Sequence, residues 1–94
     1  MSEKDTNNNY LEITSDYITL DANNKSILIL NQTEEYVNIK TKEMTIECND
    51  KITLKCGNNT IELSSNSITL KCGSSSIELS SSEINLKSLS INLG

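Results

Sequence analysis

Three cysteines are the side chains of this chain best suited to chemistry, because it contains no histidine. Cys48, Cys56 and Cys72 are eight and sixteen residues apart, and each continues the alternating parity of the apolar pair before it. This spacing matches no zinc-binding pattern, and an odd number of cysteines cannot form a complete set of disulfides within one chain. We expect small apolar side chains buried next to corners, in a reducing compartment. If three copies assemble, equivalent cysteines could instead hold a soft metal or form a disulfide between chains.

Charged side chains recur at a fixed spacing in the second half of the chain. Glu62 and Glu78 are 16 residues apart, as are Lys55, Lys71 and Lys87. Acid–base catalysis needs a cleft and shifted pKa values, whereas this repetition indicates a smooth, solvated strand surface. Histidine, the commonest general base and metal ligand, is missing. We therefore expect no catalytic residue, no metal, no cofactor, and a protein that is not an enzyme.

These side chains are set in a repeat of short apolar pairs. Each pair has two apolar residues separated by one residue, which is the alternation of a strand with one buried face. The eleven pairs are Leu11/Ile13, Ile18/Leu20, Ile27/Ile29, Val37/Ile39, Met44/Ile46, Ile52/Leu54, Ile61/Leu63, Ile68/Leu70, Ile77/Leu79, Ile84/Leu86 and Ile91/Leu93. The six residues 52–57 recur as 68–73, and the five residues 61–65 recur as 77–81. A repeat of this kind indicates a repeated structural unit.

The pattern predicts an all-β protein. Asn, Ser, Asp and Gly stand between the pairs, as in Gly57-Asn58-Asn59 and Gly73-Ser74-Ser75, and no helical period occurs. An up-and-down sheet needs hairpin turns of the Asn-Gly or Gly-Gly type, and none is present. Two aliphatic residues per strand fill only a very narrow tube. We therefore expect an intertwined, parallel, homotrimeric β-helix, a triangular prism needle in which three chains meet along one axis.

Composition and charge support assembly over an isolated domain. The chain has 94 residues, of which 3% are aromatic and none is Phe or Trp, so it lacks the large side chains on which a small domain depends. The net charge is −5, with −6 over residues 1–50 and +1 over residues 51–94, which excludes a general nucleic-acid binder. No run approaches the roughly 20 apolar residues of a membrane span, and no export signal is found at the start.

The strings KITLKCG at residues 51–57 and ITLKCGSSSI at residues 68–77 resemble the C-terminal β-helical needle of the VgrG spike proteins of type VI secretion. These spikes are similar to the cell-puncturing spikes of contractile phage tails. The resemblance covers about residues 10–94 and is closest over residues 51–94. It implies a homotrimer capped at its C-terminal end by a PAAR-like tip protein and joined at its N-terminal end to a hub, baseplate or tube component. It also implies assembly in the bacterial cytoplasm, delivery across the envelope and a transient encounter with a target membrane.

The parts of the needle follow from the repeat. Residues 1–9 are expected to be a flexible leader, and residues 10–94 the needle itself. The last pair is followed by no polar cap, so Leu89, Ile91, Leu93 and Gly94 are expected to form the docking surface at the tip. The side chains expected along the axis are Ile52, Leu54, Ile61, Leu63, Ile68, Leu70, Ile77, Leu79, Ile84 and Leu86.

Two alternatives fit the same repeat. One is a single-chain β-solenoid that serves as a binding module, of the adhesin or ice-binding type. The other is a functional amyloid segment, since short apolar β repeats are typical of stacked strands. The mass in solution separates the three possibilities.

Overall fold

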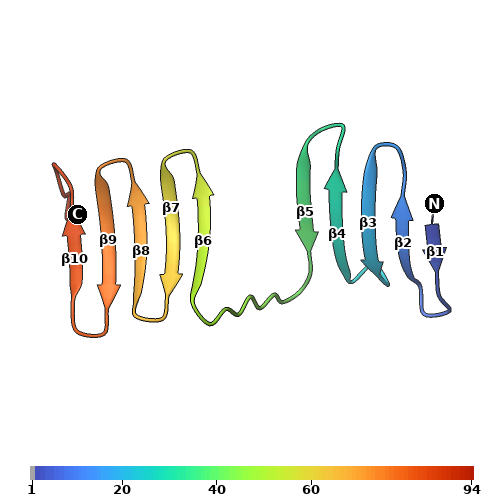
Figure 1. Ribbon diagram of the computed structural model, residues 1–94, viewed down its shortest axis with the longest axis horizontal. Coiled ribbons are helices and arrows are strands. Elements are labelled where there is room, and N and C mark those ends of the chain that lie inside the picture. Colours follow the sequence, from blue (N-terminus) through green and yellow to red (C-terminus); the bar gives the residue numbers. More distant parts are fainter. Residues whose placement is uncertain (1) are drawn as a thin grey trace. The chain divides into compact units, whose positions relative to one another are not determined.

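A computed structural model describes residues 2–94 and confirms that the protein is all-β. The strands form two antiparallel sheets in two separate units, one through Thr45 and one from Ile46 to Gly94 (Figure 1). The strands of the first sheet are β1 (Ser2–Lys4), β2 (Asn9–Ile13), β3 (Tyr17–Ala22), β4 (Ser26–Asn31) and β5 (Tyr36–Lys40). Those of the second are β6 (Lys51–Cys56), β7 (Asn59–Ser64), β8 (Ser67–Cys72), β9 (Ser75–Ser80) and β10 (Ile84–Lys87). No helix long and apolar enough to cross a membrane occurs among residues 2–94.

The first sheet is a meander in which every strand pairs with the next one in the chain, in the order β1-β2-β3-β4-β5. Its turns are closed by short polar side chains. The Asp5 carboxylate accepts hydrogen bonds from the backbone N–H groups of Asn7 and Asn9 at 2.9 and 2.8 Å. Asn23 and Asn24 adopt positive φ angles of 50° and 59°, which asparagine tolerates better than most residues. The predicted leader, residues 1–9, therefore includes strand β1 in its described part, and Met1 lies outside the described residues.

The second sheet is also a meander, and its turns correct one step of the sequence interpretation. Cys56 pairs with Asn59 and Cys72 pairs with Ser75, which leaves two-residue loops at Gly57-Asn58 and Gly73-Ser74. Both glycines have positive φ, 59° and 58°, at the first central position, where type II′ hairpin turns favour glycine. The exclusion of hairpin turns was wrong, because Gly-Asn and Gly-Ser close a hairpin as well as Asn-Gly does.

A different turn closes the opposite end of both sheets. Ser64 Oγ accepts a hydrogen bond from the Ser67 N–H at 3.1 Å, and Thr14 Oγ1 accepts one from the Tyr17 N–H at 3.0 Å. A hydroxyl side chain at the end of a strand thus replaces a glycine in reversing the chain. Since glycine turns and hydroxyl turns alternate in the second sheet, its 16-residue repeat corresponds to one hairpin.

Strand pairing places the apolar pairs on one face of each sheet, with one correction. Leu20 pairs with Leu28 and Ile18 with Leu30, so the apolar pair of β4 on this face is Leu28/Leu30. Ile27 and Ile29, predicted as that pair, point to the opposite face, because the side-chain period of a strand is two and a shift by one residue reverses the face. Two predicted pairs, Met44/Ile46 and Ile91/Leu93, lie outside the strands.

Candidate interaction surfaces

The second sheet carries a continuous aliphatic surface, which we call the second apolar face. Directly paired residues of antiparallel strands lie on the same face, so the register defines its members. One row runs Ile52, Leu63, Ile68, Leu79, Ile84 across the five strands, and the other runs Leu54, Ile61, Leu70, Ile77, Leu86. These ten residues are the ten predicted along the axis. The structure brings all of them together on one face, and their meeting along an axis stays a prediction.

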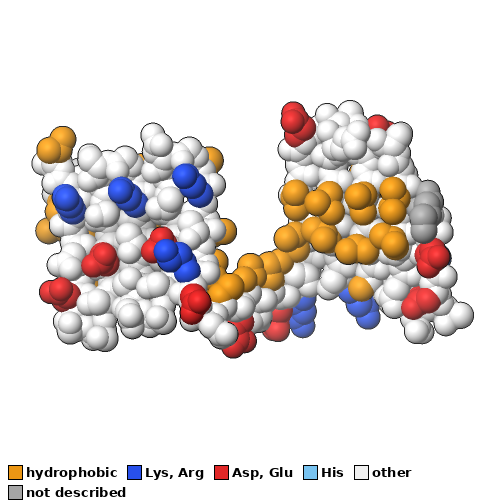
Figure 2. Space-filling model, viewed as in Figure 1, with side chains coloured by type: hydrophobic (Ala, Val, Ile, Leu, Met, Phe, Trp, Pro, Cys, Tyr) orange, Lys and Arg blue, Asp and Glu red, His pale blue; other side chains and the backbone are white. Residues whose placement is uncertain are grey.

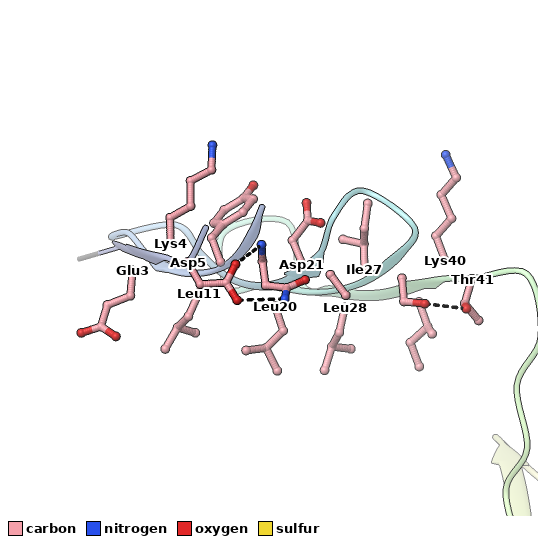
Figure 3. A pocket seen from close by; sticks show the side chains of 15 residues that line it. Glu3, Lys4, Asp5, Leu11, Leu20, Asp21, Ile27, Leu28, Lys40 and Thr41 are labelled. Atoms are coloured by element: carbon pink, nitrogen blue, oxygen red, sulfur yellow. Dashed lines mark hydrogen bonds between the residues drawn. The ribbon is translucent and has the colours of Figure 1, made fainter. Parts of the chain in front are cut away.

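The first sheet carries a similar surface, the first apolar face. Its two rows of four are Leu11, Leu20, Leu28, Ile39 and Ile13, Ile18, Leu30, Val37. They form the two orange bands over this unit in Figure 2. In Figure 3, Glu3, Leu11, Leu20 and Leu28 point to one side of the sheet, while Lys4, Asp21, Ile27 and Lys40 point to the other. A shallow depression of about 650 Å³ lies along the first of these rows.

Neither face is covered. Among the described residues no hydrophobic side chain is buried, and Leu54, Leu86 and Ile84 are 58, 50 and 66% exposed. The accessible surface of the chain is 8119 Å². A folded domain of this mass exposes about 5,400 Å², and two separate domains of half the mass about 6,500 Å² in total. The excess of roughly 1,600–2,700 Å² is of the size that one chain contributes to an obligate assembly.

Only two of the four residues predicted to dock at the tip line a common groove in the structure. Ile91 and Leu93 line a groove of about 760 Å³ with the second row of the second apolar face. Leu89 is fully exposed, and Gly94 has a positive φ of 92° with open space around it. No strand is formed after Lys87 in the described chain. The structure therefore attaches Ile91 and Leu93 to the apolar face, and the tip docking surface stays a prediction.

The outward face of the second sheet is polar throughout. Its central row is Thr53, Glu62, Thr69, Glu78, Asn85, and the next row is Lys55, Thr60, Lys71, Ser76, Lys87. The three lysines of the second row stand out as a blue line over this unit in Figure 2. Lys51 Nζ lies 3.8 Å from Glu62 Oε1, with both side chains exposed enough for solvent to screen the pair. The predicted solvated role of Lys55, Lys71, Lys87, Glu62 and Glu78 agrees with this position.

The cysteines are exposed thiols in the single chain. Cys56 and Cys72 end β6 and β8 next to the glycine turns, and Cys48 lies in the segment without strand structure. Their burial, which the sequence predicts, requires another chain to cover them. Residues 2–94 contain no group of three or more His, Cys, Asp or Glu side chains placed to hold a metal.

Two titratable groups are perturbed in the first sheet. The pKa of Asp5 is lowered, chiefly by the hydrogen bond from the Asn9 backbone N–H. The pKa of Tyr17 is raised, because its hydroxyl donates a hydrogen bond of 2.7 Å to Glu12 and because that carboxylate is negatively charged. The sequence interpretation attached no role to the tyrosines beyond their scarcity. The signal that would have found them is their parity, since all three alternate with the apolar residues of the first sheet.

No protein-family model, no curated protein and no solved structure matches this chain.

Proposed function

We propose that the chain is a structural protein. Three identical copies of it form a homotrimeric β-helical needle that pierces membranes as part of a contractile injection system. The observation that carries this proposal is the uncovered pair of apolar faces. Eighteen aliphatic side chains are sorted onto one side of each sheet, yet no hydrophobic residue described in the chain is buried. Leaving such surfaces in water is unfavourable, at about 25 cal/mol per Å² of apolar area.

Three copies suit these faces better than two. The faces consist of Ile, Leu and one Val, without Phe or Trp, and each strand from β2 to β10 contributes two side chains. Two sheets packed face to face stand about 10 Å apart and leave both pairs of edges open. Three faces around one axis enclose a narrow triangular core that two aliphatic side chains per strand can fill. A prism also lets neighbouring chains cover the outer edge strands, which otherwise invite aggregation.

The intertwined, parallel winding is the form of the prism that we favour for residues 51–94. Within one chain these strands are joined by hairpins of two residues at the glycine turns. In the intertwined form each strand pairs with strands of the other two chains, while the same alternation keeps the same ten side chains inside. Gly57 and Gly73, which need positive φ, then turn the chain at corners of the prism instead of reversing it.

Such a needle needs no catalytic residue. Continuous backbone hydrogen bonding around three chains makes it stiff along its axis, and its outward rows of Thr, Ser, Lys and Glu resist adhesion to other sheets. We place a PAAR-like tip protein at the C-terminal end, on the predicted docking residues Leu89, Ile91, Leu93 and Gly94, and a hub or tube component at the N-terminal end. The likeness of residues 51–57 and 68–77 to VgrG needles supports this polarity.

The test is the mass in solution, measured by light scattering after size exclusion over a dilution series. We expect a mass near three chains that persists on dilution. A monomer would contradict the needle and favour a single-chain binding module, and polydisperse polymer would favour the amyloid alternative. Mild oxidation tests the parallel alignment in a variant that keeps Cys56 and carries Cys48→Ser and Cys72→Ser. Parallel chains bring the three Cys56 side chains to one level and give disulfide-linked chains, and a further Cys56→Ser change removes those products.

A further inference from the structure

The outward face of the first sheet holds a depression lined by all three tyrosines of the chain. It has a volume of about 360 Å³. We call it the tyrosine hollow, and its lining consists of Tyr10, Glu12, Tyr17, Thr19, Asp21, Ile27, Ile29, Asn31 and Tyr36. Its residues come from four neighbouring strands, β2 to β5. It lies on the side of the sheet opposite the first apolar face, so packing of that face leaves the hollow open.

The sheet itself does not require these side chains. The outward face of the second sheet, which has the same meander topology, carries no aromatic or aliphatic residue in its two main rows. In the first sheet the same side of the strands carries Ile27 and Ile29 and the three tyrosines. The departure from an all-polar outward face is therefore a property of this site.

The hollow has a buried floor and fixed walls. Thr19, in the centre, is 5% exposed and is the most deeply buried side chain described. The Tyr17 hydroxyl donates a 2.7 Å hydrogen bond to Glu12 Oε1, which fixes both side chains over this floor. Tyr17 and Tyr36 stand on either side of Asn31 in one row, two strand spacings or about 9.6 Å apart. The Asn31 side chain lies between them and donates a 3.5 Å hydrogen bond from Nδ2 to the Tyr36 hydroxyl, which holds Tyr36 at the edge of the hollow.

The charge of the lining selects the ligand. Glu12 and Asp21 contribute two carboxylates, and no lysine lines the hollow. Asp21 is held in place because its Oδ1 accepts a hydrogen bond from the Asn24 N–H at 2.7 Å. Lys4 and Lys40 share the outward face with Asp21 but stand at the two ends of its row, on β1 and β5.

We propose that the tyrosine hollow binds a small organic cation with a quaternary ammonium group, as in choline. Aromatic faces attract such a cation, and a weakly hydrated trimethylammonium group loses little by leaving water. The two carboxylates add attraction, and the apolar side chains Ile27 and Ile29 contact its methyl groups. A phosphate or another anion is disfavoured by the same carboxylates. The site uses only residues of the first sheet and does not depend on the proposed needle.

The experiment titrates the full chain with choline chloride and follows the tyrosine ring resonances by NMR. The comparison ligand is the neutral isostere of choline, in which a tert-butyl group replaces trimethylammonium. We expect saturable binding of choline and at least a tenfold preference over the isostere. Tyr36→Leu is expected to weaken binding by about threefold to thirtyfold, the range of one cation–π contact, and Glu12→Gln to weaken it at least threefold. Glu62→Gln, the matched change on the second sheet, is expected to leave it unchanged.

Two results would overturn the proposal. One is equal binding of the neutral isostere, which would reduce the site to apolar contact. The other is an unchanged affinity in both Tyr36→Leu and Glu12→Gln. Vesicles then identify the source of the cation. Adsorption to phosphatidylcholine but not to phosphatidylglycerol vesicles assigns the site to a lipid headgroup, and choline binding without adsorption assigns it to a free ligand.

Discussion

Truncation of Leu70 tests whether the second apolar face becomes the core of an assembly. Leu70 lies on β8, the central strand of the second sheet, and pairs with Ile61 on one side and Ile77 on the other. In the single chain it is 39% exposed, so Leu70→Ala would remove a side chain that is already partly hydrated. In a trimer with this face inside, the side chain is fully buried in each of three copies.

The two situations predict different magnitudes. A buried Leu→Ala change costs about 2–5 kcal/mol per site, so a trimer with three such sites loses about 6–15 kcal/mol. A partly exposed leucine on an open sheet costs on the order of 1 kcal/mol per chain. The matched control is Thr69→Ala on the same strand. Thr69 faces outward between Glu62 and Glu78, and its replacement costs up to about 1 kcal/mol in strand preference.

The assay is denaturant unfolding at several protein concentrations, with the mass followed by light scattering. We expect Leu70→Ala to lower the unfolding midpoint strongly and to shift the trimer toward dissociation on dilution, while Thr69→Ala stays close to the parent. Equal and small effects of the two changes, with the mass unaltered, would refute the reasoning that this face is the core.

Further expectations concern the turns and the perturbed side chains. Gly73→Val forces a β-branched residue to a φ of 58° in otherwise open space, so it should cost about 1–3 kcal/mol of unfolding free energy, with a smaller loss in Gly73→Asn. Asp5, whose pKa is lowered on folding, stabilises the β1–β2 turn above the ordinary aspartate range. This contribution is lost as pH falls through the lowered pKa; amide exchange at Lys4 and Tyr10 should accelerate there in the parent but show no such transition in Asp5→Asn. Tyr17, whose pKa is raised, contributes stability below the ordinary tyrosine range that is lost as pH rises through the raised pKa. Phenolate absorbance should show late titration of Tyr17, and Glu12→Gln should lower its pKa toward the ordinary tyrosine value.

The strands, and the sheet face to which each side chain points, were largely predictable from the sequence. Successive side chains of a strand point to opposite faces, so apolar and polar residues alternate with a period of two. Nine of the eleven apolar pairs fall in strands, and the ten predicted axial residues share one face. The error in β4 arose where four aliphatic residues follow one another, at 27–30, since such a run fits either parity. Only the neighbouring strands, through Leu20 and Ile18, decide which pair joins the apolar face.

Strand order and the candidate site were harder to predict from the sequence. Whether Gly57-Asn58 reverses the chain or turns it at a corner depends on the partner strand, and local sequence does not specify that partner. The tyrosine hollow needs residues from four strands, and their meeting depends on the register of every turn between residues 9 and 40. Tip docking by Leu89, Ile91, Leu93 and Gly94 depends on how other chains meet this one, which the residue spacing of one chain does not encode.

The short hairpins of the second sheet bear on how the protein reaches its final state. Every strand of this sheet pairs with its neighbour in the chain, so its contacts are local and can form on the microsecond timescale of single hairpins. The aliphatic rows are then assembled before any partner arrives, and the proposed intertwined needle requires these hairpins to open again. The slow step becomes this opening together with the encounter of chains, whose rate rises with protein concentration. In a cell that produces this chain, ordered association competes kinetically with non-specific aggregation. Synthesis of several copies from one message, close together in space, would favour the ordered outcome.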